Sequence, residues 1–182
     1  MGILIDGNEL AKQIRITLKK RIQKDIDAGN APCLAVVLVG DDPGSQIYVR
    51  NKEKFAARAG IGSRVIRKPA DTTQQQLLSI INELNADDSV HGILVQLPLP
   101  RHLDESAAIT AIDPGKDVDG IHVVNAGRLL RGLEGLRACT PLGIIRMLDA
   151  YQIPIEGKHA VVIGRSNIVG KPIAIMLMER NA

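Results

Sequence analysis

Short apolar runs alternate with longer amphipathic segments along most of this sequence. The clearest runs are residues 34–39 and the core of residues 90–96. Strands that are apolar on both faces are typical of a parallel sheet covered by helices on both sides. Between such runs, apolar residues recur at helical spacing, as Leu10, Ile14 and Leu18 do. The alternation predicts an α/β fold whose parallel strands are joined by helical crossovers.

The same reading places individual elements along the chain. We expect strands at residues 3–5, 34–39, 63–67, 90–96 and 158–163, and helices at residues 8–28, 45–60, 73–85, 125–131, 140–151 and 169–180, with a short helix opening at Asp104. The expected N-caps are Ser45, Thr72 or Thr73, Asp104, and Thr140 followed by Pro141.

The alternation breaks between residues 113 and 140, where turn-forming and acidic residues gather. We interpret this stretch as the link between two domains. Residues 1–138 then form an N-terminal parallel-sheet domain, and residues 139–182 begin a Rossmann-like dinucleotide-binding domain. Because one strand and one helix cannot cover a sheet, we expect either that the chain is a piece of a longer protein that continues beyond Ala182 or that it ends in a poorly packed edge.

Composition limits the classes of function. Aromatic residues make up 2% of the chain, which argues against a protein that stacks nucleic-acid bases. The net charge of +3 is scattered and suits an anionic small molecule. No apolar run approaches the ~20 residues of a membrane span, the four histidines lack metal-ligand spacing, and the two cysteines fit a reducing cytoplasm. We therefore expect a cytoplasmic protein with no nucleic-acid partner, no membrane partner and no metal.

The first candidate site combines Tyr48, Lys52 and Gln96. Tyr48 and Lys52 are four residues apart and share one helix face, and Gln96 ends a strand. Ligands of α/β sheets bind where the carboxyl ends of the strands form a crevice. The set favours a flat, polar-edged ligand whose carbon–nitrogen bonds need proton handling. A half-buried tyrosine beside a surface lysine, and an amide that satisfies a loop, remain the alternatives.

Two loops extend this candidate site. Pro98 and Pro100 fix the loop after Gln96, where a cis bond at one of them is an option. Asp117 and Asp119 flank Val118 in a turn-rich segment. A carboxylate there could bind a ring that carries amino and amide N–H groups, although ordinary turn chemistry explains the same residues.

The second candidate site lies at residues 164–170, between a predicted strand and a predicted helix. This context is typical of a dinucleotide-binding turn, although Ser166 stands where a second glycine is usual. The helix N-terminus offers N–H groups to a phosphate. Arg165 could pair with a 2′-phosphate, which favours NADP over NAD. A plain strand-to-helix turn is the alternative.

Taken together, these segments resemble the bacterial bifunctional methylenetetrahydrofolate dehydrogenase/methenyltetrahydrofolate cyclohydrolase family. Five motifs appear in the family's order through nearly the whole chain. The matching residues are Tyr48-Val49-x-x-Lys52, Gly92-Ile93-Leu94-Val95-Gln96-Leu97-Pro98-Leu99-Pro100, Lys116-Asp117-Val118-Asp119-Gly120, Cys139-Thr140-Pro141-x-Gly143 and Gly164-Arg165-Ser166-x-x-Val169-Gly170-x-Pro172.

The resemblance implies two reactions at one site: oxidation of 5,10-methylenetetrahydrofolate with NADP, and hydrolysis of the methenyl product to 10-formyltetrahydrofolate. It implies that Tyr48 stacks on the folate ring, that Lys52 assists water attack and ring opening, and that Gln96 positions Lys52. It further assigns Asp119 to the amino edge of the pterin and Leu97 and Pro98 to substrate binding. The implied NADP-binding residues are Thr140, Gly164, Arg165, Ser166, Val169 and Gly170.

The resemblance also implies a homodimer that uses tetrahydrofolate derivatives, polyglutamylated forms among them. Two other readings stay open from the residues alone. One is another two-domain NAD(P) dehydrogenase, acting on shikimate or an amino acid. The other is a folate-binding fragment without turnover.

Overall fold

Three parallel strands form the sheet in the computed structural model, which describes residues 2–182. β1 (Cys33–Val39) lies between β2 (Gly62–Lys68) and β3 (Gly92–Val95). Val36 of β1 is in register with Val65 of β2 and Leu94 of β3. The strands predicted at residues 34–39, 63–67 and 90–96 are confirmed. Because all three are parallel, their carboxyl ends lie along the same edge of the sheet.

The chain divides into two compact units. The sheet unit is Ile14–Val118, and the helical unit combines Met1–Gln13 with Asp119–Ala182. The fold class is α/β, as predicted. The division into domains at residues 138 and 139 stays a prediction.

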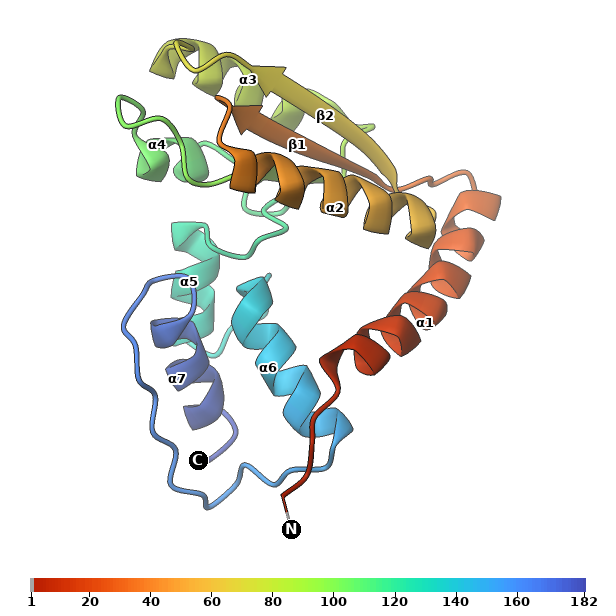
Figure 1. The fold of residues 1–182 in the computed structure, drawn as a ribbon, viewed down its shortest axis with the longest axis vertical. Helices are drawn as coiled ribbons and strands as arrows, with labels where there is room; N and C mark the ends of the chain where they lie inside the picture. Colours follow the sequence, from red (N-terminus) through yellow and green to blue (C-terminus); the bar gives the residue numbers. More distant parts are fainter. Residues whose placement is uncertain (1) are drawn as a thin grey trace. The chain divides into compact units, whose positions relative to one another are not determined.

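Helices cover both faces of the sheet within the sheet unit (Figure 1). α2 (Pro43–Ala59) lies on one face, and α3 (Gln74–Ala86) and α4 (Glu105–Thr110) lie on the other. The α2 face is packed around the buried residues Val36, Leu38, Val49 and Leu94. The opposite face holds a larger cluster that includes Ala35, Val37, Val39, Leu77, Ile81, Leu84, Ile93, Val95, Ala108 and Ile112. The two clusters hold the sheet in place, so the residues at its edges sit on a rigid base.

α1 (Gly7–Asp27) confirms the first predicted helix, but most of its apolar stripe is not buried. Ile22 is buried, whereas Ile14 and Leu18 are 47% and 37% exposed. The apolar spacing therefore predicted the helix correctly but overstated how much of its apolar stripe is buried.

The helical unit contains α5 (Val123–Leu130), α6 (Cys139–Ala150) and α7 (Gly170–Met178). α7 packs against both α5 and α6 (Figure 1). The core of this unit consists of Leu129, Ile145, Ile155, Ile173 and Met176. Its helices confirm the helical segments predicted after residue 120, with ends shifted by a few residues.

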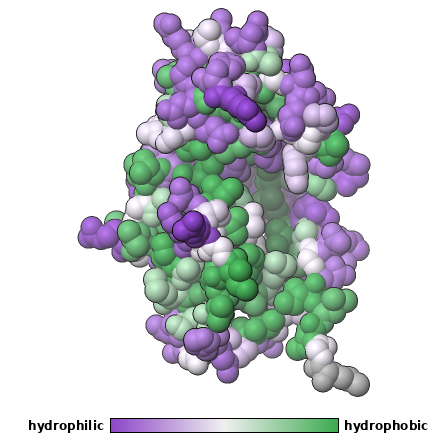
Figure 2. All heavy atoms as spheres, turned by 60° about the vertical axis from the view of Figure 1, so that its left-hand side comes forward, coloured by the Kyte–Doolittle hydropathy of each residue, from purple (hydrophilic) through white to green (hydrophobic). Residues whose placement is uncertain are grey.

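Two predicted strands are wrong. Residues 3–5 and 158–163 form no strand in the structure. A parallel strand is held by hydrogen bonds to a neighbouring strand, and within residues 2–182 no strand pairs with either segment. Apolar side chains gather on the surface of the helical unit (Figure 2); Val161 and Ile163 are 72% and 99% exposed.

Helix caps correct two further predictions. Asp42, not Ser45, caps α2, and its side chain accepts a hydrogen bond from the backbone N–H of Ser45. Ala138, not Thr140, occupies the N-cap of α6. Thr73 and Asp104 cap α3 and α4 as predicted. Both helices begin earlier than predicted, because Pro43 is already the first residue of α2 and Cys139 is already the first residue of α6.

Candidate functional site

A hydrogen bond joins Lys52 on α2 to Gln96 at the end of β3. The Nζ of Lys52 donates to Oε1 of Gln96 over 3.0 Å. Lys52 is partly buried and Gln96 is 9% exposed. The structure thus brings together two of the predicted site residues at the carboxyl edge of the sheet, where α/β proteins bind ligands.

The orientation of the Gln96 amide is determined by its partners. Its Nε2 donates to the backbone carbonyl of Leu97 over 2.6 Å. An ammonium can only donate and a carbonyl can only accept, so Oε1 must face Lys52 and Nε2 must face Leu97. The backbone of Gln96 is also fixed, because its N–H donates to the carbonyl of Val37. Lys52 therefore meets a preoriented acceptor and keeps two further N–H groups for other acceptors.

Tyr48 lies one helical turn before Lys52 and is 63% exposed. Between them, Val49 faces the sheet and is fully buried. This burial fixes the rotation of α2, so that Tyr48 presents its ring to the surface beside Lys52. An accessible ring on a rigid helix can act as a stacking platform.

Ser45 is a polar residue at this helix that the sequence reasoning assigned only to a cap. It is 3% exposed, and its Oγ has no hydrogen-bond partner within residues 2–182. Ser45 and Lys52 are seven residues apart, so they lie on the same face of α2. This seven-residue spacing is the sequence signal that could have placed Ser45 on the same face as Lys52.

Asp42 completes the start of α2. The hydrogen bond from the backbone N–H of Ser45 is the largest cause that holds the pKa of the Asp42 carboxyl below its ordinary value. The carboxylate form of Asp42 therefore stabilises the end of α2 that follows the carboxyl edge of β1.

The loop after Gln96 has the rigid form that its prolines predict. The Leu97–Pro98 peptide bond is cis, which confirms the option raised from the sequence. The backbone N–H of Leu99 donates to Oε1 of Glu105 over 3.0 Å, which ties the loop to α4. Leu97 is partly buried and Pro98 is exposed, so this loop presents a fixed, partly apolar edge.

The two acidic residues after Lys116 have different environments. Asp117 is 1% exposed and pairs with Ile93 as an isolated parallel bridge beside β3. Asp119 is partly buried, and its backbone carbonyl accepts a hydrogen bond from Cys139 over 3.2 Å. Gly120 follows with φ +67° and lies against the backbone of Arg137, where a Cβ would clash. The structure therefore gives Asp117 a place in the core and leaves Asp119 as the better candidate for a ligand.

The turn at residues 164–170 closes on itself. A Cβ on Gly170 would lie 2.6 Å from the carbonyl group of Gly164, so only glycine permits this approach. The Oγ of Ser166 accepts hydrogen bonds from the backbone N–H groups of Val169 and Gly170, each over 3.2 Å. Arg165 is exposed. A tight glycine-bearing turn at the start of α7 fits the predicted phosphate-binding role.

Thr140 belongs to another element, the first turn of α6, where it is exposed. Its predicted part in cofactor binding remains a prediction.

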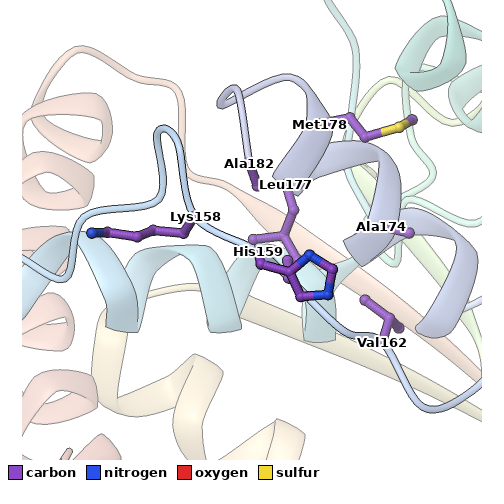
Figure 3. Close-up of a pocket in the computed structure, with 8 residues that line it drawn as sticks. Lys158, His159, Val162, Ala174, Leu177, Met178 and Ala182 are labelled. Carbon is purple, nitrogen blue, oxygen red and sulfur yellow. The ribbon is translucent and has the colours of Figure 1, made fainter.

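A separate pocket of about 350 Å³ lies between residues 158–162 and α7 (Figure 3). His159 and Val162 line it from the segment before α7, and Ala174 and Leu177 line it from the helix. None of the predicted site residues lines this pocket. Among residues 2–182, no group of three or more histidine, cysteine or acidic side chains could hold a metal, and no helix has the length and apolar character to cross a bilayer.

Comparison with protein families gives two matches. Residues 5–119 match the tetrahydrofolate dehydrogenase/cyclohydrolase catalytic domain, and residues 138–182 match the NAD(P)-binding domain of the same family. A protein of Halothermothrix orenii named bifunctional protein FolD is 56% identical over 184 residues, covering 100% of this chain and 65% of the relative.

Solved structures agree with these matches. The bifunctional FolD enzyme of Campylobacter jejuni superposes with a TM-score of 0.98 at 50% identity, over 99% of this chain and 64% of that chain. The Trypanosoma brucei FolD, solved with NADP cofactor and an inhibitor, gives a TM-score of 0.93 at 35% identity, over 100% of this chain and 62% of that chain. The chain thus spans just under two thirds of the length of these relatives.

Proposed function

This chain belongs to the tetrahydrofolate dehydrogenase/cyclohydrolase family, and from that premise we propose that the protein catalyses both reactions in the family name. The first oxidises 5,10-methylenetetrahydrofolate to methenyltetrahydrofolate with NADP. The second hydrolyses the methenyl compound to 10-formyltetrahydrofolate. The observation that carries this proposal is the hydrogen bond between Lys52 and Gln96 at the carboxyl edge of the sheet.

Folate binding is assigned to Tyr48, to the loop after Gln96 and to Asp119. Tyr48 stacks its exposed ring on the flat ring system of the substrate. The rigid edge formed by Leu97 and Pro98 supports the substrate beside Gln96. Asp119 binds the amino edge of the pterin, because a carboxylate accepts two N–H groups from one planar ring edge.

Lys52 carries the hydrolysis. Water adds to the carbon between N5 and N10 and loses one proton, which leaves a hydroxyl on that carbon. The bond from the carbon to N5 then breaks as N5 takes up a proton and the hydroxyl gives up its proton to become the formyl carbonyl. An ammonium next to the bridge stabilises charge that develops in these steps or supplies the proton to the departing nitrogen. Gln96 holds Lys52 by one N–H and leaves the others for the reacting atoms, so it acts as a positioning residue.

The turn at residues 164–170 is assigned to NADP, which accepts a hydride from the methylene carbon when it is bound. The backbone of Gly164 lies so close to Gly170 that Gly170 can carry no side chain, and this tight turn at the start of α7 supports a role in phosphate binding. Arg165 pairs with the 2′-phosphate. Ser166, Val169, Gly170 and Thr140 complete the assigned contacts.

Three finer points belong to the same proposal. The substrates include polyglutamylated folates, and the net charge of +3 supports binding of an anionic tail. The protein acts in the cytoplasm, which the free cysteines Cys33 and Cys139 support. It acts as a homodimer, as its resemblance to the family implies.

Two assays on the purified protein test the proposal. 5,10-Methylenetetrahydrofolate with NADP should yield reduced cofactor, and methenyltetrahydrofolate alone should lose its absorbance as it is hydrolysed. Reduction of the cofactor with shikimate or an amino acid, and not with the folate, would show another dehydrogenase. Folate binding in a titration without either reaction would show a binding protein. An absence of binding and of both reactions would refute the proposal.

A further inference from the structure

Lys116 is bound to the end of helix α3 by three hydrogen bonds. Its Nζ donates to the backbone carbonyls of Leu84, Asn85 and Asp87 over 3.2, 2.8 and 2.9 Å. The last carbonyls of a helix lack partners within the helix and carry its negative dipole end. One ammonium therefore uses all three of its donors on the C-terminus of α3.

Asn85 makes the reciprocal contacts. Its Nδ2 donates to the carbonyl of Ala111 over 2.7 Å, and its Oδ1 accepts from the backbone N–H of Asp113 over 2.8 Å. Thus a side chain of α3 holds the backbone of the loop, while a side chain of the loop holds the backbone of α3. We refer to Asn85 and Lys116 together as the clamp.

The segment after the clamp runs along β3. The backbone N–H of Ile93 donates to the carbonyl of Lys116 over 2.7 Å, and Ile93 forms a parallel bridge with Asp117. Val118 packs against the cluster on the α2 face, and Gly92 leaves the space for it. Because the bridge is parallel, the chain leaves Lys116 in the direction of the carboxyl edge, where Gln96 lies. Asp119 follows Val118 in the chain.

We propose that Lys116 and Asn85 position the backbone that carries Asp119 and thereby set the affinity for the folate ring. The inference rests on the proposed function, in which Asp119 binds the pterin. Neither clamp residue touches the substrate, so both are positioning residues. A carboxylate two or three residues beyond a fixed point keeps its geometry only if that point does not move, and small displacements of binding groups are costly.

The test uses the protein as its gene encodes it, with the variants Lys116→Met, Lys116→Arg and Asn85→Ala. The matched control is Thr73→Ala, which removes a cap at the opposite end of the same helix and lies outside the proposed binding machinery. KM and kcat for methenyltetrahydrofolate, the midpoint of urea unfolding and hydrogen exchange at the Ile93 amide are measured for each.

We expect Lys116→Met to raise KM roughly tenfold with kcat nearly unchanged, because it weakens binding and not chemistry. Asn85→Ala should act in the same direction, and Lys116→Arg should fall between Met and Lys, since a planar guanidinium reaches fewer of the carbonyls. Exchange at Ile93 should accelerate about tenfold in Lys116→Met. Thr73→Ala should lower the unfolding midpoint while leaving KM and Ile93 exchange as in the unmodified protein.

An unchanged KM in Lys116→Met, or an equal rise in Thr73→Ala, would overturn the inference. If the unmodified protein neither binds nor converts the folate, the proposed function fails, and with it the role assigned to the clamp in affinity. The exchange result then decides separately whether Lys116 holds this segment: unaltered exchange at Ile93 would refute the positioning itself.

Discussion

The Nζ of Lys52 lies 3.0 Å from Oε1 of Gln96, and this hydrogen bond links the middle of α2 to the end of β3. The two side chains come from positions 44 residues apart in the chain. Gln96 is itself held by the carbonyl of Leu97, so Lys52 is directed by an acceptor that cannot rotate freely. The role proposed for Lys52 depends on this arrangement.

Gln96→Ala should slow the hydrolysis of methenyltetrahydrofolate by on the order of 10- to 100-fold, because Lys52 loses the acceptor that orients it. Initial rates at saturating substrate measure the effect. Gln96→Glu provides the comparison: a carboxylate still attracts Lys52 but cannot donate to Leu97, so its activity should also fall. Normal rates in both variants would show that the hydrogen bond has no role in turnover.

Tyr48→Ala should raise KM for the folate roughly tenfold, since loss of one aromatic stacking contact costs about 1–3 kcal/mol. Tyr48→Phe keeps the ring and should retain a KM close to that of the unmodified protein. Because Tyr48 is 63% exposed, neither change should alter the unfolding midpoint appreciably. Equal KM values in the Ala and Phe variants would contradict a stacking role.

Gly92→Ala should destabilise the protein by about 1–3 kcal/mol, the usual cost of overpacking. A Cβ at this position would overlap Val118, whose branched side chain is partly buried against the sheet. Urea unfolding measures the loss. The double variant Gly92→Ala with Val118→Ala should be less destabilised than the two single effects added together; simple additivity would show that the two sites do not interact.

The Asp42 carboxyl predicts a pH dependence of stability. Its pKa is lower in the folded protein, chiefly because of the hydrogen bond from the Ser45 backbone. Its contribution is therefore complete above the ordinary pKa of an aspartate and is lost as the pH falls from there through the lowered value. Asp42→Asn keeps an N-cap that does not titrate. Unfolding midpoints of this variant should decline less steeply below about pH 4 than those of the unmodified protein; parallel declines would exclude Asp42 as a contributor.

β1 and β3 could be predicted from sequence because they are contiguous apolar runs that are largely buried. Residues 34–39 show this most clearly, since β1 lies in the middle of the sheet and residues 35–39 are all buried. In β2, by contrast, only Val65 and Ile66 are partly buried. Residues 158–163 have a similar apolar pattern, yet they form no strand. An apolar pattern reports a tendency to be buried, whereas a strand also needs a paired neighbour.

Some residues of the candidate site could also be predicted from sequence, and others could not. Tyr48, Lys52 and Gln96 could be found because helical spacing and strand ends can be read locally. The clamp could not, because Asn85 and Lys116 are 31 residues apart and their bonds go to backbone atoms. Spacing patterns carry no information about contacts between a side chain and a distant backbone carbonyl. The seven-residue spacing could have placed Ser45 on the same helix face as Lys52, but the burial of its Oγ without a partner becomes apparent only in the folded chain.

The most direct test compares the hydrolysis of methenyltetrahydrofolate by the unmodified protein with that by Lys52→Met and Lys54→Met. Lys54 is an exposed lysine on the same helix, so its replacement controls for charge and for helix stability. The account predicts that Lys52→Met loses nearly all hydrolysis above the uncatalysed rate, while Lys54→Met hydrolyses the substrate normally. Hydrolysis by Lys52→Met at the unmodified rate would contradict it.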